Sequence, residues 1–151
     1  MAPTERDPAA APLRILHVVE AFGGGVFEMV RTLAGRLAEA GESVAIAYGR
    51  RPETPALVRE LVAPAVELYE LPWQRRGPLE QVRAGRHLRH LVGAWQPDVI
   101  HLHSSFAGVV GAITLDRSIP IVYTPHGYSF TMGDQGRLRR LAYRALERST
   151  A

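Results

Sequence analysis

The sequence of 151 residues contains no cysteine and no lysine. Without cysteine it has no disulfide framework, no thiolate metal site and no cysteine nucleophile. No apolar run approaches the roughly 20 residues that a membrane-spanning helix needs. All 18 basic residues are arginines, and the net charge of +3 favours an anionic ligand or surface only mildly. We therefore predict a soluble cytoplasmic protein, and we expect no nucleic-acid partner.

Two common nucleotide-binding signatures are also missing. The dinucleotide fingerprint needs GxGxxG and an acidic residue that closes the second strand, and the phosphate loop needs a lysine. In their place, three consecutive glycines, Gly23, Gly24 and Gly25, lie between an aliphatic run and apolar residues at helical spacing. This pattern predicts a strand, a tight turn and a helix whose N-terminal N–H groups can meet an anion. A tight turn without a ligand is the alternative.

The same alternation of strand and helix continues along the chain. Predicted strands cover residues 13–19, 43–48, 66–71, 98–103 and 119–124, and predicted helices cover 26–39, 56–62, 78–95, 104–115 and 137–148. This alternation predicts an α/β fold, a doubly wound Rossmann-like parallel sheet of strand order 3-2-1-4-5. Residues 1–12 are predicted to be a disordered leader, and residues 13–151 to form one domain.

Three polar stretches leave the predicted strands at the same edge of the sheet. They are the glycine turn, the pair His103 and Ser104, and the pair His126 and Gly127. Ligands of such sheets bind outside the carboxyl ends of the strands, where the strand order reverses. We therefore predict one crevice there, and we expect Ser104 to cap the helix that follows it.

Histidine invites a metal interpretation. His101 and His103 lie on one face of a predicted strand, and His126 follows the next strand. Since no carboxylate or thiol stands near them at ligand spacing, we predict that no metal is bound. His17 is predicted to be a hydrogen-bonded core residue, and the histidines of helix 78–95 to be solvated. His126 lies in a polar loop between proline and glycine, which makes it the candidate catalytic residue.

The predicted last helix, residues 137–148, has arginines along one side. An ordinary solvated helix face is one interpretation. The other is peripheral contact with anionic lipid headgroups at the inner face of the membrane.

Three stretches together identify a family. HVVEAFGGGVFEMVRTLA, PDVIHLHSSFAGVVGA and IVYTPHGYSF resemble the N-terminal domain of family-4 glycosyltransferases with the GT-B fold. Within that family they look most like bacterial enzymes that assemble capsule, exopolysaccharide or other cell-surface glycans. The resemblance implies a hexosyltransferase-like enzyme that transfers a sugar, with retention, from a nucleotide-sugar donor to a glycan or lipid-linked acceptor. It implies no cofactor and no metal.

The resemblance also implies roles for the predicted site residues. The backbone of Gly23, Gly24 and Gly25 would face the donor phosphates and the acceptor. His126, with Gly127 beside it, would contact the transferred sugar, and His103 and Ser104 would lie on the acceptor side.

The family continues with a second Rossmann-like domain that holds the nucleotide. We therefore expect the chain to need that C-terminal nucleotide-binding domain, which is absent from this sequence, and to be inactive by itself. Two alternatives stay open. One is a non-catalytic module that binds a sugar or glycan, and the other is an unrelated nucleotide-binding Rossmann domain such as a reductase.

Overall fold

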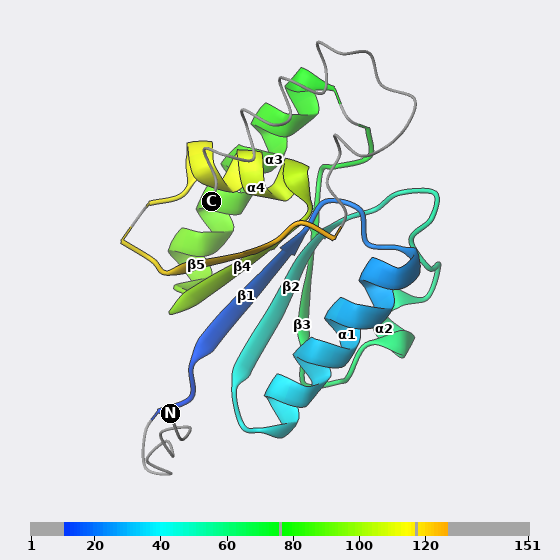
Figure 1. Ribbon diagram of the computed structural model, residues 1–151, viewed down its shortest axis with the longest axis vertical. Helices are drawn as coiled ribbons and strands as arrows, with labels where there is room; N and C mark the ends of the chain where they lie inside the picture. Colours follow the sequence, from blue (N-terminus) through cyan, green and yellow to red (C-terminus); the bar gives the residue numbers. More distant parts are fainter. Residues whose placement is uncertain (1–10, 76, 117, 127–151) are drawn as a thin grey trace.

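The computed structural model describes residues 11–75, 77–116 and 118–126. Most of the predicted leader, Gly127 and the predicted helix 137–148 therefore lie outside the described residues. The strands are β1 Arg14–Val19, β2 Ser43–Gly49, β3 Glu67–Leu71, β4 Val99–His103 and β5 Ile121–Thr124, and the helices are α1 Gly24–Glu39, α2 Val58–Leu61, α3 Pro78–Trp95 and α4 Ser105–Thr114 (Figure 1).

All five strands are parallel, and their order is β3-β2-β1-β4-β5. This confirms the predicted Rossmann-like sheet and its strand order. Val19 at the end of β1 lies opposite His103 at the end of β4, and His103 lies opposite Thr124 at the end of β5. The three strands therefore end together, so the loops that follow them start from one edge.

Helices cover both faces of the sheet, with α1 and α2 on one side and α3 and α4 on the other (Figure 1). Each side has its own buried core. Leu16 and Val18 of β1 belong to the core under α3 and α4, whereas Val19 belongs to the core under α1. The aliphatic run of β1 has apolar residues on both faces because a central parallel strand is buried on both faces.

The helix boundaries show where local sequence signals act. Gly41 follows α1 with φ of +91°, and the N–H of Glu42 donates to the Leu37 carbonyl at 3.0 Å, as in a glycine-terminated helix. Pro78 occupies the first turn of α3. Helix α1 begins at Gly24, before the predicted start, so two of the three glycines belong to its first turn. None of the described helices has the length and apolar character needed to cross a bilayer.

Candidate functional site

The three glycines after β1 differ in the space around their Cα atoms. Gly23 holds the N-cap position of α1, and a Cβ added there would lie 2.5 Å from the carbonyl oxygen of Glu53 in the loop after β2. Gly24 has φ of +53°, and a Cβ at Gly24 or Gly25 would meet nothing within 4 Å. Gly23 is therefore required by packing, whereas Gly24 and Gly25 face open space.

The first turn of α1 keeps unused donors. The earliest backbone bond of the helix runs from the N–H of Phe27 to the Gly23 carbonyl at 3.2 Å, and no side chain caps Gly23. The N–H groups before Phe27 have no partner within the helix, and they carry the positive end of its dipole. An anion can approach them closely because Gly24 and Gly25 have no side chains.

A buried ion pair links the chain just before this turn to the loop after β2. Glu20, at the end of β1, is 1% exposed and forms a salt bridge with Arg51 of the loop after β2. The backbone N–H of Arg51 donates to the Thr54 hydroxyl at 2.9 Å, which shapes the same loop. Sequence analysis did not single out Glu20, although an acidic residue that directly follows the two buried valines at the end of a strand is an available signal.

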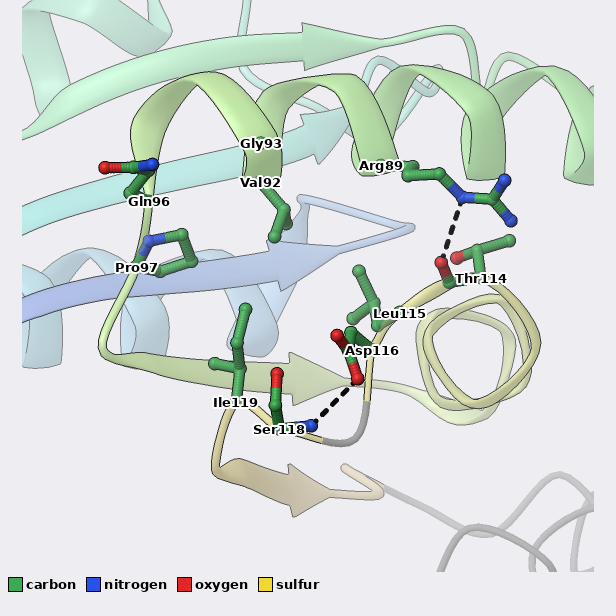
Figure 2. Close-up of a pocket in the computed structure, with 10 residues that line it drawn as sticks. All are labelled: Arg89, Val92, Gly93, Gln96, Pro97, Thr114, Leu115, Asp116, Ser118 and Ile119. Carbon is green, nitrogen blue, oxygen red and sulfur yellow. Dashed lines mark hydrogen bonds between the residues drawn. The ribbon is translucent and has the colours of Figure 1, made fainter.

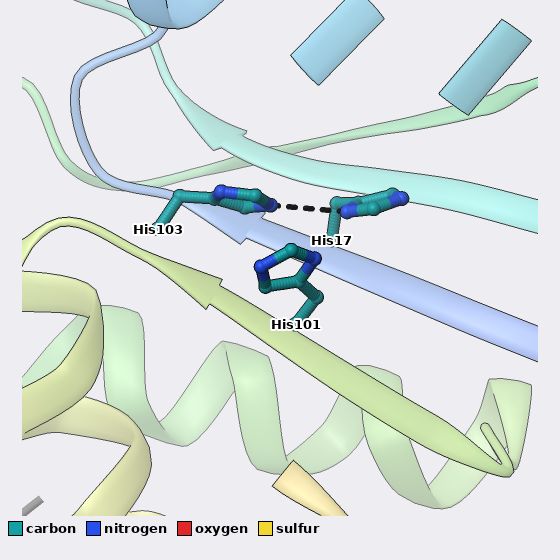
Figure 3. Close-up of side chains that lie close together, drawn as sticks. All are labelled: His17, His101 and His103. Atoms are coloured by element: carbon teal, nitrogen blue, oxygen red, sulfur yellow. Dashed lines mark hydrogen bonds between the residues drawn. The ribbon is translucent and has the colours of Figure 1, made fainter. Parts of the chain in front are cut away.

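The second part of the site is a group of histidines on adjacent strands. His17 lies opposite His101 in the β1–β4 register, and His103 follows two residues later on the same face. His17 Nδ1 lies 3.0 Å from His103 Nε2, and Figure 3 shows this hydrogen bond beside the ring of His101. His103 Nδ1 lies 2.9 Å from Nε2 of His126. The structure therefore joins His103 and His126 directly, a bond that the sequence pattern did not predict.

Burial keeps these imidazoles neutral. His17 and His103 are both 0% exposed. Burial lowers the pKa of His17 to about 3, and the nearby charge of His101 lowers it further. Burial also lowers the pKa of His103 to about 2, helped by the neighbouring histidines. Partial desolvation lowers the pKa of His101 and His126 as well. At neutral pH the cluster therefore offers both N–H donors and nitrogen lone pairs.

Two sequence predictions about histidines have different outcomes. The two histidines of α3 are exposed, as predicted. His17 was predicted to be fully hydrogen-bonded, and this is right for Nδ1 but wrong for Nε2, which is buried without a hydrogen-bond partner. Ile46, the residue opposite His17 on β2, is buried and apolar and offers Nε2 no hydrogen bond.

Among the described residues, one group is close enough to share a metal ion. His17, His101 and His103 each offer a ring nitrogen, and these three atoms lie within 4.8 Å of one another. His126, which the sequence pattern placed beside them, is not part of this group. No carboxylate belongs to it either, so a bound dication would have three neutral ligands.

Ser104 is the strained residue of the site. It takes the N-cap position of α4, as predicted, but its side chain makes no capping hydrogen bond. Its φ is +85°, which is uncommon for a residue other than glycine, and its hydroxyl is buried without a hydrogen-bond partner. Its N–H donates to the Thr124 carbonyl at 3.1 Å. This backbone bond ties Ser104 to the end of β5, two residues before His126.

A cavity of about 410 Å³ lies at the other end of the sheet, beside the amino ends of β4 and β5 (Figure 2). It is lined by residues that precede β4 and β5, such as Pro97 and Ile119, and by the ends of α3 and α4. Its charged residues bond to other residues of the lining: Arg89 donates to the Thr114 carbonyl at 3.2 Å, and Asp116 accepts from the Ser118 N–H at 3.1 Å. It is therefore separate from the predicted crevice.

The fold resembles solved structures at low sequence identity. A glycosyltransferase from Rickettsia africae ESF-5 matches with a TM-score of 0.62 and 17% identity, over 89% of this chain and 34% of that chain. A putative UDP-N-acetylglucosamine 2-epimerase from Listeria monocytogenes matches with a TM-score of 0.60 and 14% identity, over 93% and 37%. A glycosyltransferase from Streptomyces sp. SF2575 matches with a TM-score of 0.54 and 15% identity, over 89% and 44%.

The chain thus spans less than half the length of these solved structures. Because transferases and an epimerase share the fold, the likeness alone does not identify an activity. No curated protein matches the sequence. The model of the family described as "Glycosyl transferase 4-like domain" matches residues 24–151, which include every predicted site residue except Gly23. The chain belongs to this family of glycosyltransferase domains, with the N-terminal Rossmann-like architecture of the GT-B fold.

Proposed function

We propose that this domain forms the acceptor-side wall of a retaining, hexosyltransferase-like enzyme of bacterial cell-surface polysaccharide synthesis. The donor would be a nucleotide sugar, and the acceptor a glycan or a lipid-linked sugar. The observation that carries the proposal is that the open α1 turn and the bonded pair His103 and His126 leave the sheet at the same ends of adjacent parallel strands.

The chemistry of sugar transfer suits these groups. A departing diphosphate develops negative charge, which preorganised backbone N–H groups stabilise without reorganising. The free N–H groups of the α1 turn are such donors. Neutral His126 offers a hydrogen bond to a hydroxyl of the sugar, and Ser104 lies beside it toward the acceptor. In this proposal the transfer itself uses no metal ion and no other cofactor.

The proposed reaction needs a second wall that grips the nucleotide, because transfer depends on holding donor and acceptor together. We therefore infer that a C-terminal nucleotide-binding domain is the partner of this one. We place the enzyme in the cytoplasm, at the inner face of the membrane, where a lipid-linked acceptor is accessible. The basic helix predicted over residues 137–148, outside the described residues, would supply the contact with anionic lipid.

The test compares the 151-residue chain with the same chain fused to the nucleotide-binding domain of another family member. Each is assayed for nucleoside diphosphate release with a panel of nucleotide sugars and glycan acceptors. We expect no turnover from the chain alone and turnover from the fusion. Turnover by the chain alone would contradict the two-domain mechanism. A folded fusion that binds glycans without turnover would favour the alternative of a non-catalytic binding module.

The His126→Ala variant of the active fusion is expected to lower turnover by about 10²- to 10³-fold, the size of effect seen when one hydrogen bond that strengthens in the transition state is lost. The melting temperature should change little, since His126 is exposed. His90→Ala, which alters an exposed histidine of α3, is the control and should keep the full rate. A near-normal rate for His126→Ala would remove this residue from the catalytic site.

The glycines give a second test, which separates packing from binding. Gly23→Ala is expected to lower the free energy of unfolding by roughly 1–3 kcal/mol, because its Cβ meets the Glu53 backbone. Gly25→Val should change stability by less than about 1 kcal/mol, because its side chain enters open space. It should nevertheless weaken donor binding by keeping phosphate away from the backbone. Urea denaturation and calorimetric titration with the donor measure the two effects, and normal donor affinity in Gly25→Val would support a ligand-free turn.

A further inference from the structure

Three histidines form one continuous hydrogen-bonded chain. His17 is joined to His103 at 3.0 Å, and His103 to His126 at 2.9 Å. The inner two rings are 0% exposed, whereas His126 is exposed at the edge of the sheet. This row of hydrogen bonds therefore leads from the interior of the sheet to His126, the residue that we propose to contact the sugar.

Because each neutral ring carries a single N–H, the tautomer of one histidine fixes the tautomers of the other two. A neutral imidazole carries one N–H and one lone pair. Burial lowers the pKa of both inner rings far below neutral pH, so each has a single N–H. Both nitrogens of His103 contact another imidazole, so it must donate to one neighbour and accept from the other. Only two arrangements satisfy both bonds, one with all N–H groups directed outward and one with all directed inward.

His17, at the inner end of this row of hydrogen bonds, decides between the two arrangements. His17 Nε2 is buried without a hydrogen-bond partner. In the inward arrangement this nitrogen would carry an N–H without an acceptor. In the outward arrangement it would carry a lone pair without a donor. Orphaned buried N–H groups are the rarer defect in folded proteins. The outward arrangement is therefore favoured, and it gives His126 its N–H at Nδ1, the nitrogen away from His103.

We propose that His103, backed by His17, is a positioning residue that holds His126 as the Nδ1–H tautomer, with this N–H available to an oxygen of the substrate. That the oxygen belongs to a sugar rests on the proposed function. The tautomer itself does not, because it follows from bonds inside the domain. His103 thus controls both the ring orientation of His126 and which of its nitrogens can donate.

A metal ion in the same cluster is the competing arrangement. Zn²⁺ binds imidazole nitrogen at about 2.0–2.1 Å, which places two tetrahedral ligands roughly 3.3 Å apart. His17 Nδ1 and His103 Nε2 are closer than that and face each other as hydrogen-bond partners. A dication there would have no carboxylate from the described residues to balance its charge. The direct hydrogen bond is therefore the better-supported state of the two nitrogens.

The test is an imidazole ¹H–¹⁵N multiple-bond NMR spectrum of the ¹⁵N-labelled chain at neutral pH, which distinguishes Nδ1–H from Nε2–H for each histidine. We expect His126 in the Nδ1–H form, although a free histidine side chain in water prefers Nε2–H. In His103→Leu, the ratio of Nδ1–H to Nε2–H at His126 should fall at least about fivefold, the equivalent of one hydrogen bond of about 1 kcal/mol. His90→Ala, at an exposed histidine of α3, is the control and should leave the ratio unchanged.

An Nε2–H form of His126 in the unaltered chain would overturn the proposal, and this measurement stands even if His103→Leu fails to fold. An unchanged ratio in a folded His103→Leu would overturn it as well. Added Zn²⁺ provides the remaining comparison. One tightly bound equivalent that shifts the His17 and His103 nitrogens would establish the metal site instead, whereas an unchanged spectrum supports the chain of hydrogen bonds. None of these readouts needs a substrate, so they can fail independently of the turnover test on His126.

Discussion

Acidification to about pH 5 is expected to lower the free energy of unfolding of this domain by about 4 kcal/mol. The cause is the pair of buried imidazoles. The pKa of His17 is about 3 and that of His103 about 2 in the folded chain, against 6.5 for an exposed side chain. Each contributes about 1.4 kcal/mol per pH unit once the pH is well below 6.5. This loss is a large part of the 5–15 kcal/mol typical of a domain.

The sign follows from proton binding. Below pH 6.5 the unfolded chain takes up protons on both histidines, but the folded chain does not until the pH falls to about 3. Protons therefore favour the unfolded state, so stability is complete above pH 6.5 and decreases as the pH falls through the window below it. The lowered pKa values of His101 and His126 act in the same direction.

Urea denaturation at a series of pH values between about 7.5 and 5 measures the effect. The variant His17→Leu removes one of the two buried sites and should reduce the slope by about half. His90→Ala removes an exposed histidine and should leave the slope unchanged. An unfolding free energy that stays level over this range would contradict the burial of neutral imidazoles at β1 and β4.

Replacement of Glu20 by alanine is expected to cost about 3–5 kcal/mol of folding stability. Glu20 is 1% exposed, and the side chain of its partner Arg51 is 10% exposed. Removing the carboxylate would leave a guanidinium charge with little access to water, which is far more costly than losing an exposed pair. The pair also ties the loop after β2 to the end of β1, so the glycine turn should lose its fixed position and bind donor more weakly.

Two controls isolate the buried charge. The double variant Glu20→Leu, Arg51→Met replaces the pair with apolar side chains and should recover most of the stability that Glu20→Ala loses. Glu28→Ala breaks a pair with Arg31 in which the side chains are 60% and 37% exposed, and it should cost less than about 1 kcal/mol. Urea denaturation at neutral pH measures all three. A loss for Glu20→Ala as small as that for Glu28→Ala would show that the pair does not stabilise the loop.

Local sequence signals were sufficient for most of the fold. The aliphatic run of β1, the glycine that ends α1 and the proline that begins α3 each act over a few residues, so their effects can be predicted without tertiary structure. The alternation of strands and helices predicted a doubly wound parallel sheet, and 3-2-1-4-5 was expected as the order typical of Rossmann-like sheets. The same topology predicted that the glycine turn, His103 and His126 lie at one end of the sheet, because the carboxyl ends of parallel strands lie together.

What only the tertiary structure decided are the contacts between residues distant in the sequence. His17 and His103 are separated by 86 positions, and their hydrogen bond exists because β1 and β4 pair in a register that aligns His17 with His101. Periodicity assigns a residue to one face of a strand, but a shift of two residues keeps every side chain on its face, so periodicity alone does not choose between such registers. The pairing of Glu20 with Arg51 likewise depends on how two loops pack. Pattern therefore predicted which residues share the edge, whereas strand register and loop packing decided which of them are bonded, since both arise from the mutual fit of elements that local sequence does not encode.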